Sequence, residues 1–210
     1  MSLIDEQAAF YRERVPDQFN QLLERQCRDA ADDPAAARML EEMQAVRTSI
    51  VIQVDCGDAM HRTFYDIDRG EMRTVERPTH APFLILGHVL DDFAAIRREC
   101  GDSLLGFLGA LAGLGEEMRL TSQRVRSLRD LHGSLVFERV GPDGFTLFVS
   151  LGIESPEPEP RTTIRINEKI YASLRRGDLD PQDAFLDGLI DVEGDMEMAL
   201  GLALAALSPD

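Results

Sequence analysis

Two stretches of this sequence match each other without a gap, and this match limits the possible folds more than any other feature. Residues 93–118 (FAAIRRECGDSLLGFLGALAGLGEEM) align with residues 171–196 (YASLRRGDLDPQDAFLDGLIDVEGDM), 78 positions further on. The strand-like segments before them, SIVIQVD and SLVFERV, align at a shift closer to 85. Chance matching of short apolar patterns is the alternative explanation. We interpret the match as two copies of one unit, in which strands precede helices.

The spacing of apolar residues supports this division, because it changes twice from a period of two to a helical period. Residues 1–47 have helical spacing, with helix start signals at Pro16 and at Asp33 followed by Pro34. Strands are expected at residues 49–55, 63–68, 70–77, 82–86, 134–140, 145–151 and 162–166. The sequence therefore predicts an α+β protein with a mixed or antiparallel sheet covered by helices. It would comprise a helical leader at residues 1–47 that packs on the first unit, a first unit at 48–131 and a second at 132–210.

The end of the chain combines an acidic segment with an apolar helix. Gly177 is placed to end one helix, and Asp180 followed by Pro181 can begin the next. The residues LIDVEG then alternate as a strand does. A last helix should begin after Asp195, with one apolar stripe at Met196, Ala199, Leu200, Ala203, Leu204 and Leu207. Since the rest of this helix is also largely apolar, it should be buried, bind a ligand or dock on a partner.

This order of features resembles the sterol carrier protein type-two family of lipid-binding domains. The resemblance rests on GDLDPQDAFLDG, VEGDM and the apolar helix, within residues 177–207. VPDQFN at residues 15–20 and the segment 50–72 are also similar to the N-terminal half of the family. The first copy departs from the motif, because GDSLLGFLGAL stands in place of LDPQDAFLDGL and GEE in place of EGD.

The resemblance implies an apolar tunnel between sheet and helices that holds a fatty acid, an acyl-CoA or a sterol-like lipid. It implies non-enzymatic binding or carrying, without a cofactor. Residues expected to line the first cavity are Phe83, Ile85, Phe93, Ile96, Phe107 and Met118. Residues expected to line the second are Ile164, Ile166, Leu174, Phe185, Met196, Leu200 and Leu204. The alternative is that these residues fill two ordinary cores, in a structural, assembly or auxiliary protein whose terminal helix docks on a partner enzyme.

Charge and cysteine usage exclude several classes of function. The formal net charge of -16 at pH 7 should repel nucleic-acid phosphates, so no nucleic-acid partner is expected. The longest apolar run, residues 104–115, is too short to span a bilayer, so no stable membrane insertion is expected. Cys27, Cys56 and Cys100 form no CxxC pair and the N-terminus lacks a signal-peptide pattern, which favours the cytoplasm. A homodimer or another protein partner remains open.

The sequence contains no recognisable catalytic or metal-binding pattern. There is no G-x-S-x-G motif, and the histidines lack the spacing of metal ligands, which predicts neither enzyme nor metal site. These histidines are His61, His80, His88 and His132. Cys56 stands between Asp55 and Asp58, which should raise the pKa of its thiol in a hairpin turn.

One arginine pair ends a predicted helix in each copy: Arg97 with Arg98, and Arg175 with Arg176. Cations in this position complement the helix dipole. The functional alternative is that they bind a lipid head group or a CoA phosphate.

Overall fold

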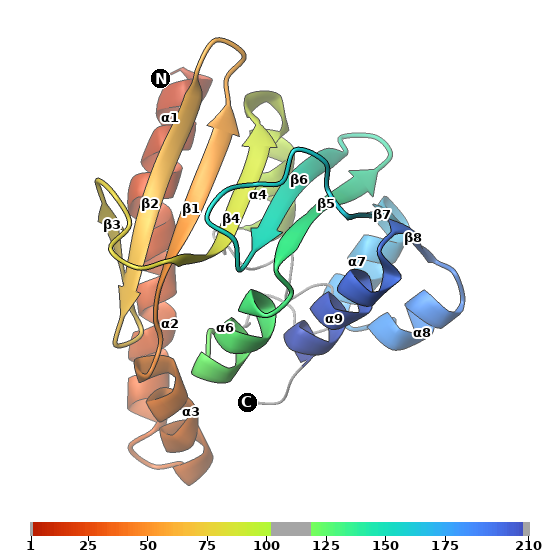
Figure 1. The fold of residues 1–210 in the computed structure, drawn as a ribbon. Coiled ribbons are helices and arrows are strands. Elements are labelled where there is room, and N and C mark those ends of the chain that lie inside the picture. Colours follow the sequence, from red (N-terminus) through yellow and green to blue (C-terminus); the bar gives the residue numbers. More distant parts are fainter. Residues whose placement is uncertain (1, 102–118, 208–210) are drawn as a thin grey trace.

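The strands of this protein form one continuous mixed sheet. The computed structural model describes residues 2–101 and 119–207, and within them the strand order is β3-β2-β1-β4-β6-β5-β7-β8 (Figure 1). The strands are β1 (Arg47–Asp55), β2 (Met60–Asp68), β3 (Glu71–Val75), β4 (Pro82–Val89), β5 (Gly133–Val140), β6 (Phe145–Leu151), β7 (Thr162–Asn167) and β8 (Ile190–Gly194). The prediction of an α+β protein with a mixed sheet is confirmed.

Helices precede, connect and follow these strands. The described helices are α1 (Leu3–Ala9), the π-helix η1 (Phe10–Arg14), α2 (Val15–Asp29), α3 (Pro34–Gln44), the 3-10 helix η2 (Leu90–Asp92), α4 (Phe93–Cys100), α6 (Ser122–Arg129), α7 (Glu168–Arg176), α8 (Pro181–Leu186) and α9 (Met196–Leu207). The side chain of Asp33 accepts a hydrogen bond from Ala35 and caps α3, and Asp180 caps α8 in the same way. Both helix starts were predicted from the sequence.

The two halves of the sheet have the same local topology. In the first half, β1 pairs antiparallel with β2 and parallel with β4; in the second, β5 pairs antiparallel with β6 and parallel with β7. The antiparallel pairing of β4 with β6 joins the halves. Residues 102–116, which align with α8 and β8, lie outside the described residues. The origin of both halves from one repeated unit therefore stays a prediction.

Alternate strand residues face opposite sides of the sheet. Ile50, Leu84 and Leu151 occupy adjacent register positions on one side, within a buried core that includes residues of α2, α4, α6, α7 and α9. Val51 and Ile85 are paired on the other side. In Figure 1, α1 and α2 run behind β1 and β2, whereas the connection from β6 to β7 passes in front of the sheet.

Candidate functional site

The residues expected to line the second cavity divide into a buried set and an exposed set. Ile164 and Ile166 on β7 and Leu174 on α7 are buried in the core. Helix α9 packs against α6, β7 and β8, and its inner side presents Met198 and Leu202 to the same core. The side chain of Asp195 accepts a hydrogen bond from the Met198 amide (3.1 Å), so it caps α9 as predicted.

Three large residues of the stripe predicted on the last helix lie on its outer side, whereas Ala199 of the same stripe is buried in the core. Met196, Leu200 and Leu204 are 43%, 42% and 67% exposed, whereas Leu202 is 2% exposed. These three residues therefore do not contribute to the core, and their contact with a ligand stays a prediction. Helical spacing could not identify the inner side, because α9 is apolar all round and a second stripe fits equally well. We call Met196, Leu200 and Leu204 the outer face of α9.

Helix α8 lies between α7 and β8 in the sequence. Its Ala184 is fully buried, Phe185 is half-buried and Leu186 is 71% exposed. A large exposed leucine on so short a helix adds to the apolar surface near the C-terminal end of the described chain. Phe185, which was expected to line the second cavity, thus lies at the boundary between the core and solvent.

The residues expected to line the first cavity do not share one surface. Phe83, Phe93 and Ile96 are buried in the core, whereas Ile85 lies on the opposite side of the sheet. A register shift between Ser49 and Ile50 brings Leu84 to the core side beside Phe83. Phe83 and Ile85, which were both expected to line the first cavity, therefore lie on opposite sides of the sheet. Phe107 and Met118 lie outside the described residues.

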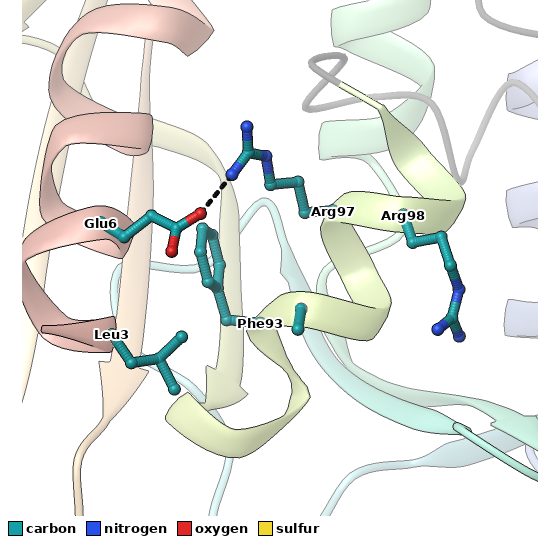
Figure 2. Close-up of a pocket in the computed structure, with 6 residues that line it drawn as sticks. Leu3, Glu6, Phe93, Arg97 and Arg98 are labelled. Carbon is teal, nitrogen blue, oxygen red and sulfur yellow. Dashed lines mark hydrogen bonds and ion pairs between the residues drawn. The ribbon is translucent and has the colours of Figure 1, made fainter. Parts of the chain in front are cut away.

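The arginine pairs end their helices as predicted, and each guanidinium contacts acidic groups of the protein. Arg97 forms an ion pair with Glu6 (2.5 Å), and Arg98 with Asp143 (3.4 Å). Figure 2 shows the two side chains at a cavity of about 310 Å³ between α1 and α4, pointing in different directions. Because the two guanidinium groups do not converge, the structure favours a structural role over a head-group clamp.

The second pair behaves in the same way. Arg175 donates to the backbone carbonyl of Glu99 and lies 3.3 Å from its carboxylate, so it ties α7 to α4. Arg176 pairs with Asp178 (2.7 Å) just beyond the end of α7. These contacts, together with the helix dipole, account for both cations without a bound ligand.

Comparison with known proteins found a family match for the part of the chain that contains α6, α7, α8 and α9. The model of the SCP-2 sterol transfer family matches residues 121–206. This part of the chain is similar to the SCP-2 sterol transfer family. Among solved structures, sterol carrier protein 2 from Yarrowia lipolytica (apo form) is 18% identical over 56% of this chain and 90% of that chain, with a TM-score of 0.30. No curated protein matched the chain.

The SCP-2 segment runs from α6 to α9 and includes fewer than half of the residues. The resemblance predicted for residues 177–207 is confirmed by this match. Residues 15–20 and 50–72 lie outside it, and their resemblance stays a prediction. Within the described ranges, no helix is both long enough and apolar enough to cross a membrane.

A buried polar network links the helical leader to the first half of the sheet. The Tyr11 hydroxyl lies 2.8 Å from Nε2 of His88, and Tyr65 donates to the carbonyl of Tyr11 (2.6 Å). Nδ1 of His88 lies 2.7 Å from the carbonyl of Val89. A carbonyl can only accept, so Nδ1 carries the proton and Nε2 accepts from Tyr11. This neutral histidine holds η1 against β4, and sequence spacing gave no sign of it.

Protonation of His88 should destabilise the fold. Burial lowers the pKa of His88, and this effect exceeds the opposing influence of the Val89 carbonyl and of Asp92. The unfolded chain therefore binds the proton more readily, and the free energy of unfolding should fall as the pH drops below about 6.5. Urea melts at pH 7 and pH 5 should show a larger loss for the wild type than for His88→Gln.

The exposed His61 provides the control, since His61→Gln should lose stability on acidification as the wild type does. An equal loss for His88→Gln and the wild type would show that His88 does not govern this dependence.

Proposed function

We propose that this protein binds and carries a hydrophobic ligand through its SCP-2 segment, without catalysis and without a cofactor. The ligand class is a fatty acid, an acyl-CoA, or a sterol- or isoprenoid-like lipid. The observation that carries the proposal is a helix that is apolar on both sides within a segment of the SCP-2 family. We place this binding in the cytoplasm, in keeping with the absence of a CxxC pair.

Helix α9 is the element that we expect the ligand to contact. Its inner side contributes to the core with Met198 and Leu202, while its outer face leaves Met196, Leu200 and Leu204 exposed. Side chains left exposed contribute none of the free energy that their burial would supply, and exposed apolar surfaces of this kind mark interaction sites. In the proposed complex the acyl chain covers the outer face and continues toward Phe185 on α8.

The expected affinity follows from the apolar surface of the ligand. Complete burial of a sixteen-carbon chain would gain about 12 kcal/mol, at about 0.8 kcal/mol per methylene, which sets the upper limit for a chain that covers the outer face. Association and ordering costs remove roughly a third to a half of this gain. A dissociation constant on the order of micromolar to tens of micromolar is expected, within the range of fluorescent fatty-acid displacement.

Replacing Leu200 with Gln should weaken fatty-acid binding about tenfold or more, because the amide must be desolvated beneath the acyl chain. Since Leu200 is 42% exposed, the free energy of unfolding should change by less than about 1 kcal/mol. Displacement titrations and urea melts on the same preparation measure both effects. Leu3→Gln is the matched control, because Leu3 is 40% exposed on α1, outside the SCP-2 segment.

Equal affinities of Leu200→Gln, Leu3→Gln and wild type would remove α9 from the binding site. A wild type that neither binds a fatty acid nor carries a lipid detectable by native mass spectrometry would contradict the carrier function itself.

A second candidate function is favoured by the same exposed helix. The outer face of α9 could dock on a partner enzyme or on a second copy of the chain, in an assembly or auxiliary role. In that case Leu200→Gln would weaken association with the partner and leave lipid binding unchanged. Size-exclusion chromatography with light scattering of wild type and Leu200→Gln tests the homodimer form directly.

A further inference from the structure

The side of the sheet opposite the helices contains a pocket that the proposed lipid site does not use. It has a volume of about 580 Å³, within the range of small-molecule sites. Val51, Phe64 and Ile85 from the adjacent strands β1, β2 and β4 form its floor. Its walls come from two chain connections, residues 76–81 after β3 and residues 152–161 after β6. We call it the sheet-face pocket.

Hydrogen bonds to the sheet hold the first wall. Asp66 accepts from the hydroxyls of Ser49 and Thr79 (both 2.6 Å) and from the Thr79 amide (3.1 Å). The amide of His80 in turn donates to Ser49 Oγ (3.2 Å). Pro78 and Pro82 also line the pocket and restrict the backbone there.

The second wall is held by an equivalent set of contacts. Glu157 accepts from the amide of Ser134 (2.7 Å), and its own amide donates to Ser134 Oγ (3.0 Å). Arg161 donates to the same carboxylate (2.7 Å). A pocket with both walls fixed is preorganised, which reduces the ordering cost of binding a ligand.

The chemistry of the pocket suits an apolar body that carries one anionic group. Val51 and Ile85 offer aliphatic surface, and Phe64 offers an aromatic face. Arg62 lies at one end and pairs with Gln53 in the register, and among the residues that the structure describes its guanidinium forms no ion pair or hydrogen bond. The Arg62 side chain is exposed to solvent, and a guanidinium beside an apolar floor offers a counter-ion to the anionic group of such a ligand.

The dimensions of the pocket limit the ligand. Pro82 at one end of the pocket pairs with Ser49 on β1, and Arg62 at the other end pairs with Gln53. Ser49 and Gln53 are four residues apart along β1, so the pocket is roughly 13 Å long. Glu154 lies on the second wall, and its carboxylate would repel a second negative charge on the ligand. We propose that the sheet-face pocket binds a small amphiphilic monocarboxylate, with the carboxylate on Arg62 and the apolar body over Val51, Phe64 and Ile85.

The test uses 4-phenylbutyrate as the probe, followed by amide chemical shifts of the full chain. Saturable shifts should appear at Val51, Phe64 and Ile85. Arg62→Gln should weaken binding roughly tenfold, as should replacement of the probe by neutral 4-phenylbutyramide. Arg77→Gln is the matched control, because Arg77 is exposed on the first wall segment without lining the pocket, and it should change the affinity less than about twofold.

Three results would overturn the proposal: equal weakening by Arg62→Gln and Arg77→Gln, shifts confined to other residues, or no saturation at about 10 mM probe. Leu200→Gln separates this site from the proposed lipid site, because α9 does not line the sheet-face pocket and this variant should keep its affinity for 4-phenylbutyrate. Glu154→Gln should strengthen binding, since it removes the opposing charge; a weaker complex would contradict the assigned orientation.

Discussion

Gly152→Ala is expected to lower the free energy of unfolding by about 3 kcal/mol. Gly152 has a φ of +65°, and a Cβ atom there would lie 1.8 Å from the carbonyl oxygen of Arg129, a backbone atom that cannot rotate away. The left-handed conformation costs an alanine about 1–2 kcal/mol, and the backbone shift costs a similar amount. Gly152 also donates to the carbonyl of Phe83 (3.0 Å), so the shift would disturb the junction between the two halves of the sheet.

Gly188→Ala isolates the conformational cost from the steric one. Gly188 has nearly the same φ, +67°, but nothing lies within 4 Å of the position of its added Cβ. This variant should lose only about 1 kcal/mol in the same urea melts. If both variants lose the same stability, then the close approach of Gly152 to Arg129 does not constrain the fold.

The strands and helix starts could be predicted from the sequence, because their signals are local. Alternation in SIVIQVD and FTLFVSL gave β1 and β6, and Asp33 and Asp180 mark the starts of α3 and α8 through their capping hydrogen bonds. The π-helix η1 between α1 and α2 was not predicted. It depends on packing of Tyr11 against Tyr65 and His88, which are distant in the sequence.

The pairing of β4 with β6, which joins the two halves in one sheet, could not be predicted from the spacing of apolar residues. Val149 on β6 pairs with Leu86 on β4. The sequence of each strand is equally compatible with a position at the edge of a separate sheet. Apolar character on both sides of the sheet, as in Ile50 and Val51, indicates only that something covers each side. The sheet-face pocket was missed for this reason, because its walls are connections whose paths over the sheet are not encoded by spacing.

The burial of α9 could be predicted, but its orientation could not. MEMALGLALAAL offers two apolar stripes, one through Leu200 and one through Leu202, and the difference between them arises from contacts with α6 and β7. An amphipathic helix would have fixed its own rotation by placing charges outward. Because α9 has one acidic residue, Glu197, in its first turn and no basic residue in its last, its sequence leaves the rotation to packing.

Leu202→Gln should therefore have the opposite consequence from Leu200→Gln, although the two positions are two residues apart. Leu202 is 2% exposed in the core, so the amide would be buried without hydrogen-bond partners and the cavity left by the leucine would be poorly filled. We expect a loss of about 2–4 kcal/mol in the free energy of unfolding, measured by urea melts, against less than about 1 kcal/mol for Leu200→Gln. A stable Leu202→Gln variant beside a destabilised Leu200→Gln variant would show that α9 is rotated by about half a turn. The outer face, and with it the proposed lipid contact, would then belong to the stripe through Met198 and Leu202.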